Sequence, residues 1–198
     1  MTDKYRTITS PAEASLTEKR SHFLAFAFPI ASAGEAKALV KEFTKKYYDA
    51  RHVCWAYMLG ADRREFLSTD NGEPSGTAGK PILGQINSLE LTNVIVLVVR
   101  YFGGIKLGTP GLIAAYKESA RLALDAAEIV ERHETRRITF TFPYLSMNDV
   151  MKAVKDPEIT VLERNFDNAC SLTLEIRADL AESLHDKLSD IPGVSFPD

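Results

Sequence analysis

The stretch that most constrains the fold is 70–112, in which two glycine-rich segments flank one continuous apolar run. It holds eight of the eleven glycines, and the run between them reads VIVLVV from Val94 to Val99. A strand that is apolar at every position is covered on both faces, so this strand is predicted to be central. Because glycine permits sharp turns and close approach, the flanking loops are expected to expose backbone amides. We expect the function of the chain to lie at these two loops.

The first loop, DNGEPSGTAGKP at 70–81, leads into a short helix predicted to begin near Gly79, with Pro81 in its first turn. Lys80 would stand beside free N–H groups and the positive end of the helix dipole, an arrangement that favours an anion. The alternative is a tight structural connection. The residues expected to shape and rigidify this region are Asp70, Glu73, Ser75, Thr77 and His52.

Arg100 ends the central strand directly before the second loop. A charged residue in such a place is usually paired with a carboxylate or exposed in a cleft, and Asp70 and Glu73 are the candidate partners. His52 could act as a general base or metal ligand, but no cysteine or carboxylate stands beside it in motif spacing, which favours a structural role.

The second loop, GGIKLGTPG at 103–111, precedes a helix for which Thr109 is the predicted N-cap and Pro110 the first helical residue. It matches neither the GxxxxGK[ST] nor the GxGxxG pattern, so a phosphate-binding interpretation rests on Lys106 among glycines before a helix start. The predicted RNA-binding or phosphate-binding residues are Lys80, Arg100, Lys106, Gly103 and Gly104.

The chain is predicted to form two domains, 1–134 and 135–198. In the first, residues 4–14 and 22–30 are predicted to pair as an antiparallel hairpin, and a capping box at Ser32 and Glu35 opens a helix to about Tyr48. Further strands are expected at 51–59, 65–67 and 93–102, and 128–134 is a last strand or a linker. The second domain alternates as strand, helix, strand, strand, helix, strand, the ferredoxin-like order.

Composition limits the function classes. The net charge is −3, with 17 positive and 16 negative side chains in 1–134 against 7 and 11 in 135–198. Any RNA contact must therefore rest on a local basic patch of the first domain. Two distant cysteines, Cys54 and Cys170, suit a reducing compartment, and no signal peptide or membrane span is evident. We expect a cytoplasmic protein without cofactor, metal or membrane partner, and without sequence-specific DNA binding.

Three long motifs carry a resemblance to a known family. They are EKRSHFLA at 18–25, DNGEPSGTAGKPIL at 70–83 and VVRYFGGIKLG at 98–108. On these motifs the chain resembles bacterial members of the IMPACT family over essentially its full length. The resemblance implies an α+β protein of two domains. The first would be an α/β domain like one shared by ribosomal proteins, translation factors and some small-molecule kinases, and the second would resemble the ferredoxin-like fifth domain of elongation factor G.

Two positions depart from the family pattern. The family has two aspartates where this chain has Asp70 and Asn71, which weakens a metal-binding interpretation, and it has glycine where this chain has Pro110, which suits a helix start. Eukaryotic members inhibit an amino-acid-starvation kinase through an additional amino-terminal protein-binding domain. The resemblance does not include that domain, so kinase inhibition is not expected here.

These observations lead to two hypotheses. The first is a non-catalytic, translation-associated regulator that binds RNA, the ribosome or a translation protein through the glycine-loop surface. The alternative is an enzyme or binder of a phosphorylated small molecule that uses the same loops, with His52 or Glu73 for proton transfer and Arg100 for the anion. A protein-interaction module is a third possibility. No nucleophile, base and orienting group occur at spacings that name a reaction.

Overall fold

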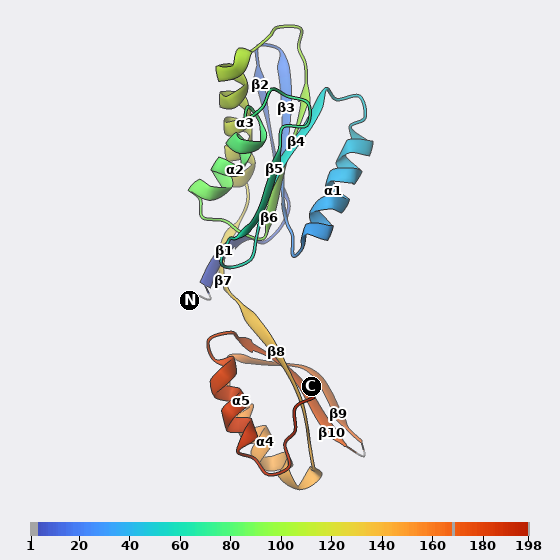
Figure 1. Cartoon of the computed structure of the whole chain (residues 1–198), viewed down its shortest axis with the longest axis vertical. Helices are drawn as coiled ribbons and strands as arrows, with labels where there is room; N and C mark the ends of the chain where they lie inside the picture. Colours follow the sequence, from blue (N-terminus) through green and yellow to red (C-terminus); the bar gives the residue numbers. More distant parts are fainter. Residues whose placement is uncertain (1–3, 168, 198) are drawn as a thin grey trace. The chain divides into compact units, whose positions relative to one another are not determined.

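The structure is a computed structural model that describes residues 4–167 and 169–197. Its contacts divide the chain into two compact units, one of residues 4–132 and one that begins at His133 (Figure 1). None of the helices among the described residues is long and apolar enough to cross a membrane.

The unit 4–132 is built on a five-stranded antiparallel sheet of order β2-β3-β6-β4-β5. The strands are β2 (Ala12–Glu18), β3 (Ser21–Pro29), β4 (His52–Leu59), β5 (Glu65–Thr69) and β6 (Val94–Tyr101). The predicted central position of β6 is confirmed. Its register places Arg100 opposite Phe23 of β3 and opposite His52 of β4, at one end of the sheet.

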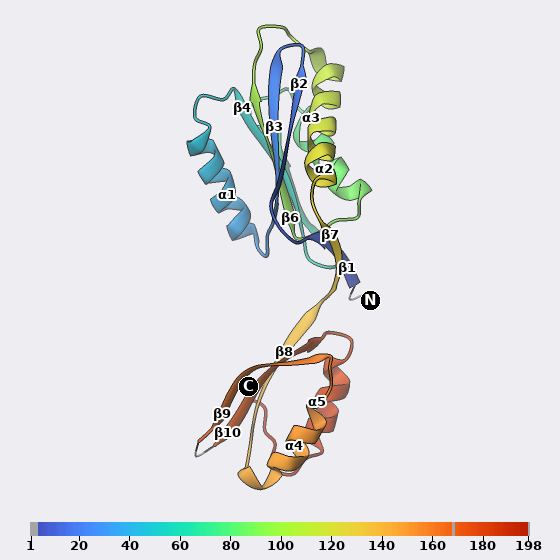
Figure 2. The ribbon, with the colours of Figure 1, turned by 180° about the vertical axis from the view of Figure 1, so that it is seen from behind.

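Helices cover both faces of this sheet (Figures 1 and 2). α1 (Ala33–Lys46) lies on one face, and α2 (Gly79–Ser88) and α3 (Gly108–Asp125) lie on the other. Alternate residues of β6 enter the two cores, and none of the six from Val94 to Val99 has exposed surface. Complete burial of such a side chain stabilises the fold by about 1.5–3 kcal/mol. The apolar run therefore makes β6 the centre of the unit.

The amino-terminal part differs from the prediction. Residues 4–14 form two strands, because the chain bends at Thr9 and Ser10 and the next residue, Pro11, has no N–H group for a ladder. β1 (Lys4–Ile8) pairs with β7 (Ile129–His133) in a separate two-stranded sheet, so the segment predicted as a last strand or a linker contains a strand. The hairpin with β3 is made by β2 and turns at Lys19 and Arg20, both with positive φ.

The predicted Ser32 cap of α1 is confirmed, and the reciprocal bond of Glu35 goes to the residue before the N-cap. Ser32 Oγ accepts from the N–H of Glu35 at 3.2 Å, and the Glu35 carboxylate accepts from the N–H of Ala31 at 2.8 Å. The helix is slightly shorter than predicted, since its C-cap is Tyr47. This arrangement fixes where the chain leaves β3 and crosses the sheet.

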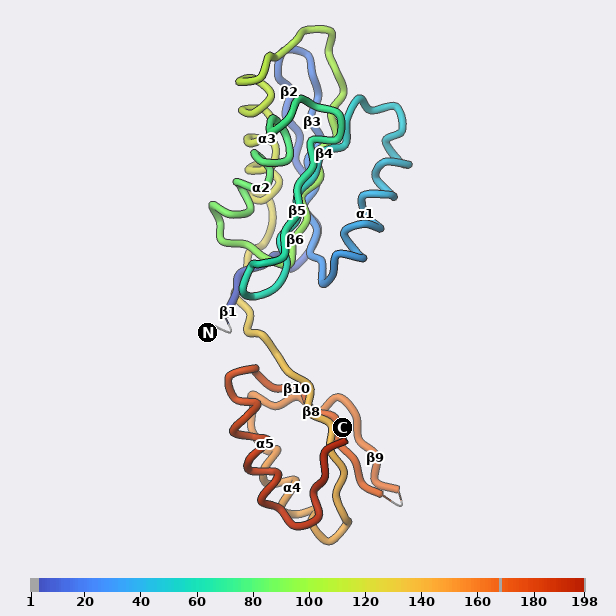
Figure 3. Tube along the Cα trace, viewed as in Figure 1, coloured from blue at the N-terminus to red at the C-terminus, as the bar shows by residue number. Residues whose placement is uncertain are grey.

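The second unit has a three-stranded antiparallel sheet of order β8-β10-β9 with helices α4 and α5 (Figure 3). Its elements follow the predicted order, with β8 (Thr135–Phe142), η1 (Tyr144–Ser146), α4 (Met147–Ala153), β9 (Ile159–Phe166), β10 (Cys170–Arg177) and α5 (Ala181–Ser189). The predicted last strand is reduced to one bridge between Ser195 and Thr141. Phe140, Leu174 and Leu188 are completely buried in its core. The likeness to the fifth domain of elongation factor G stays a prediction.

Candidate functional site

The first loop closes the start of α2 with a carboxylate of its own. Asp70 accepts hydrogen bonds from the backbone N–H groups of Gly76 at 2.7 Å, Ala78 at 2.9 Å and Gly79 at 2.8 Å. Burial acts to raise the pKa of Asp70, but these amides and Lys80 outweigh it, so the pKa of this carboxyl lies below its ordinary value. The helix start therefore already holds an anion.

This closure leaves the predicted external anion at Lys80 without the free amides on which the prediction relied. The amides that would bind the anion are occupied by Asp70, and Lys80 itself is exposed. Gly79 tightens the same corner, because a Cβ there would lie 2.7 Å from the backbone nitrogen of Thr69. The alternative interpretation, a tight structural connection, describes this part of the loop.

Other side chains of the first loop fold it onto β4. Thr77 is completely buried, and its hydroxyl donates to the carbonyl of Pro74 at 2.6 Å. The Asn71 amide donates to the carbonyl of Val53 at 2.9 Å. An aspartate at position 71 could not make that bond when ionised, so Asn71 has a structural use here. Ser75 is exposed, with no side-chain hydrogen bond among the described residues.

Glu73 is the buried centre that joins the two loops. Its Oε1 accepts from Arg100 Nη1 at 2.6 Å and from the Tyr116 hydroxyl of α3 at 2.8 Å. The side chains of Glu73 and Arg100 are only 3% and 7% exposed, so the ion pair is sheltered from solvent. Of the two predicted partners of Arg100, Glu73 is confirmed, whereas Asp70 is used at α2.

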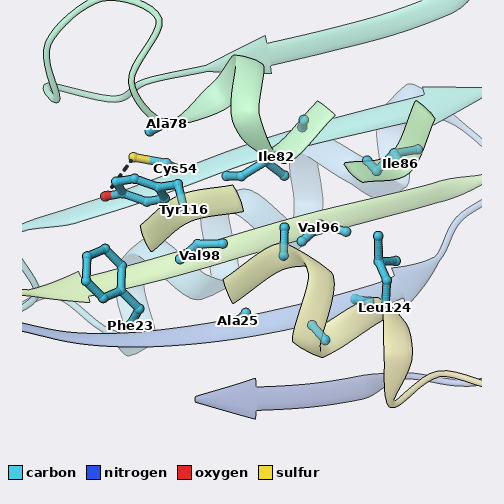
Figure 4. Packing of buried hydrophobic residues seen from close by; sticks show 14 of the residues in the cluster. Phe23, Ala25, Cys54, Ala78, Ile82, Ile86, Val96, Val98, Tyr116 and Leu124 are labelled. Atoms are coloured by element: carbon cyan, nitrogen blue, oxygen red, sulfur yellow. Dashed lines mark hydrogen bonds between the residues drawn. The ribbon is translucent and has the colours of Figure 1, made fainter. Parts of the chain in front are cut away.

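The same Tyr116 hydroxyl also meets Cys54 in the core beneath the loops. The Cys54 Sγ lies 3.4 Å from the Tyr116 hydroxyl (Figure 4). It also donates to the carbonyl of Asp70 at 2.9 Å. Burial raises the pKa of the Cys54 thiol to about 12 and raises that of the Tyr116 hydroxyl as well. Both groups therefore stay protonated near neutral pH and act as structural donors.

Arg100 has donor capacity that the protein does not use. Its Nη2 is 3.5 Å from Ser21 Oγ, a long contact, and its buried Nε has no hydrogen-bond partner among the described residues. The guanidinium carbon lies 5.6 Å from the ring centroids of both Phe23 and Phe102. These rings and Glu73 hold the guanidinium in place at the end of β6.

The second loop is shaped by contact with the β2–β3 hairpin. A Cβ at Gly103 would lie 2.0 Å from the backbone carbonyl carbon of Arg20, so only glycine fits without a shift. The N–H of Gly103 also donates to Ser21 Oγ at 3.3 Å. Gly104 has open space around it and a φ of +85°. The hairpin tip thus places the basic residue Arg20 beside the loop.

The start of α3 differs from its prediction and from α2. The helix begins at Gly108, its N-cap is Leu107, and no side chain makes a capping hydrogen bond. The predicted Thr109 cap is wrong, because Thr109 is already helical, and Pro110 lies in the first turn but is not its first residue. The first N–H groups of a helix have no acceptor within the helix. At α3 they are left available to a ligand.

A pocket opens at this uncapped helix start. It has a volume of about 430 Å³, within the range of small-ligand sites, and we name it the loop pocket. Three basic side chains and one carboxylate line it, which gives a positive balance. The lining residues are Arg51, His52, Glu73, Pro74, Arg100, Phe102, Lys106, Leu107, Gly108, Thr109 and Leu112.

His52 lies at the edge of this pocket with its orientation fixed. Its Nδ1 is 3.0 Å from the carbonyl oxygen of Asn71, which can only accept, so Nδ1 carries a proton. Its Nε2 is 3.8 Å from Glu73 Oε2, too long for a hydrogen bond. Within residues 4–167 and 169–197, no three His, Cys, Asp or Glu side chains are arranged to hold a metal ion.

The structure brings together only part of the predicted set. Arg100, Lys106, His52 and Glu73 meet in the loop pocket, whereas Lys80 does not line it. Sequence reasoning missed Arg51 and Phe102. Arg51 is brought to the pocket by the pairing of β4 with β6, and its N–H donates to the Arg100 carbonyl at 2.9 Å. The sequence of either strand alone does not give the register of this pairing, so Arg51 could not be predicted.

Fold and site together define an α+β protein whose pocket lies between two glycine loops. The sequence pattern of the Impact N-terminal domain family matches residues 19–124, which is more than half of the chain. The chain therefore belongs to the IMPACT family. The chain is 30% identical over 166 residues to the IMPACT family member YvyE of Bacillus subtilis, covering 84% of this chain and 76% of that one. YigZ of Escherichia coli is 29% identical over 174 residues, covering 87% and 85%.

One solved structure is similar over both units. It is a crystal structure described only as that of a hypothetical protein, with 25% sequence identity and a TM-score of 0.75, and the match covers 100% of this chain and 99% of that one. This likeness supports the fold and gives no information about a ligand.

Proposed function

We propose that this chain is a non-catalytic, translation-associated regulatory protein. In this proposal the domain 1–134 binds RNA, or RNA on the ribosome, through the loop pocket and the basic residues around it. The link to translation is what the resemblance to the IMPACT family implies, and the chain belongs to that family. The observation that carries the proposal is the uncapped start of α3, which opens onto a pocket with a positive balance.

A basic rim supports contact with a phosphate backbone. Lys106 and Arg51 are exposed and line the pocket, and Arg20 is exposed on the hairpin tip that packs on Gly103. Such side chains attract phosphates without reading sequence. Arg100 has a different part, because it is buried and paired with Glu73. It positions the loop and lines the pocket.

The proposal is non-catalytic because the pocket lining offers no nucleophile paired with Glu73 or His52, the groups suited to proton transfer. Glu73 accepts from two donors at one oxygen, and the His52 ring is held by the Asn71 carbonyl. Thr109 carries the hydroxyl of the lining, and among the described residues it makes no side-chain hydrogen bond to His52 or Glu73. Binding is the chemistry that this arrangement supports best.

Co-sedimentation with RNA and with ribosomes tests the proposal. The double variant Arg20→Ala/Lys106→Ala should bind about tenfold more weakly, and the slope of log affinity against log salt should fall by about 0.7 for each lost contact to single-stranded RNA. The matched control is Lys37→Ala/Lys41→Ala, which removes two exposed charges from α1 on the other face of the sheet. Equal sedimentation of the variant, the control and the original chain would refute the proposal.

The concave form of the loop pocket favours one second candidate, binding of a phosphorylated small molecule. Its volume of about 430 Å³ suits such a ligand. A thermal-shift screen with phosphorylated metabolites tests this candidate, because a ligand at 100 times its dissociation constant stabilises a protein by about 2.7 kcal/mol.

The second domain, 135–198, is proposed to bind or to act as a spacer, in line with its predicted likeness to the fifth domain of elongation factor G. Its acidic balance makes direct phosphate contact unfavourable there.

A further inference from the structure

The loop pocket combines a place for one phosphate group with an aromatic ring. Gly108 and Thr109 of the uncapped α3 start line the pocket together with Lys106. Phe102 lines it as well and is 46% exposed. A phosphate at a helix start and a base on an aromatic ring are the two halves of nucleotide recognition.

The charge of the lining selects the kind of phosphate. Glu73 compensates Arg100, which leaves Arg51 and Lys106 as the two uncompensated cations. A phosphate monoester carries about −1.5 to −2 at pH 7, which matches these two charges, whereas an internal phosphodiester carries one negative charge. The balance therefore favours a terminal phosphate.

A second observation, independent of the helix start, points to a ligand. Arg100 is 5% exposed and lines the pocket, and its Nε has no hydrogen-bond partner among the described residues. An unpaired buried donor is costly, and a bound anion lowers that cost by supplying negative charge next to the guanidinium. The α2 start offers no such donor, because Asp70 fills it.

We propose that the loop pocket binds a nucleoside monophosphate, either free or as the phosphorylated end of an RNA strand. The phosphate lies at the first turn of α3 beside Lys106, and the base lies on Phe102. This inference rests on the proposed function, because it names the part of an RNA that enters the same pocket. Phe102 offers a ring face and no base-specific donor, so we expect all four bases to be accepted.

Isothermal titration of the full chain tests the inference with AMP, adenosine and inorganic phosphate as probes. AMP should bind at least about tenfold more tightly than either fragment, because it uses both halves of the site. Lys106→Ala should weaken AMP binding by about 10- to 100-fold, and Phe102→Ala by about tenfold. Lys80→Ala, at the closed helix start, is the matched control and should leave the affinity unchanged. All three residues are exposed, so the variants should fold.

A second set of probes separates the two sources of the ligand. A short oligoribonucleotide with a 5′-phosphate should compete with AMP, and the same strand with a 5′-hydroxyl should not. If AMP binds and neither strand competes, the free nucleotide is the ligand.

Equal binding of AMP and adenosine, or no binding of AMP and of the phosphorylated strand, would overturn the inference. Co-sedimentation with ribosomes that persists in that case would leave the proposed function standing. Absence of both AMP binding and co-sedimentation with ribosomes would refute the inference and the proposed function together.

Discussion

The two glycine loops are similar in sequence character but opposite in use. The first loop leads to α2, whose start is closed by the carboxylate of Asp70, and the second leads to α3, whose start has no side-chain cap. Both helices carry proline at the third position of the first turn. The difference is the side chain of Asp70. With it, the start of α2 is a structural connection, and without an equivalent, the start of α3 is a candidate binding site.

Glu73 connects the two roles. It belongs to the first loop, yet it holds Arg100 at the end of β6 and Tyr116 on α3. The closed loop therefore positions the open one. A glycine loop before a helix is thus an anion site only where the chain has not supplied the anion itself.

The largest effect is expected from breaking this connection. Glu73→Ala leaves Arg100 buried without its counter-charge, which should lower the free energy of unfolding by about 3–5 kcal/mol. Chemical denaturation measures the loss. Glu42→Ala, at an exposed position of α1, should change it by less than about 0.5 kcal/mol. A Glu73 variant as stable as this control would show that the two loops are independent.

The second loop can be tested at its two adjacent glycines. Gly103→Ala places a Cβ against the backbone of Arg20 and should cost about 3 kcal/mol, because backbone cannot move aside as a flexible side chain can. Gly104→Ala meets open space and should cost only about 1 kcal/mol for its positive φ. Thermal unfolding of both variants compares them. Equal losses would contradict the packing of the loop on the hairpin.

The closed helix start should reveal itself by its pH dependence. The pKa of Asp70 is lowered in the folded state from an ordinary value of 3.8, so its stabilisation is fully present above that value and is lost as the pH falls below it. Asp70→Asn should cost about 1–2 kcal/mol at neutral pH and should flatten the acid limb of the stability curve. Glu42→Gln serves as the control, and an unchanged acid limb in Asp70→Asn would count against the cap.

The smallest effect on stability comes from making the open start resemble the closed one. Thr109→Asp adds a carboxylate to the first turn of α3 and should stabilise the helix by about 0.3–1 kcal/mol. It should also abolish AMP binding, because the added charge occupies the place of the phosphate. Thr109→Asn retains the size without the charge and should bind AMP. A Thr109→Asp variant that binds normally would place the ligand elsewhere.

Local patterns predicted much of the fold, and long-range packing decided the site. The apolar run of β6 and the Ser32 cap of α1 are local signals, and both are confirmed. The pairing of Arg100 with Glu73 was also predictable, since a buried charge requires a partner. The closure of α2 by Asp70 was not predictable. It depends on how the loop folds, because the carboxylate accepts from the amides of Ala78 and Gly79, which lie eight and nine residues further along the chain. The contribution of Arg51 depends on strand register.

One measurement tests the central claim most directly: an NMR titration of the isotope-labelled chain with AMP, which follows each backbone amide. The account predicts that the signals of Gly108 and Thr109 at the open start of α3 shift with saturation, while those of Gly76, Ala78 and Gly79, bonded to Asp70, stay in place. Shifts confined to the start of α2, or no shift at either helix, would contradict it.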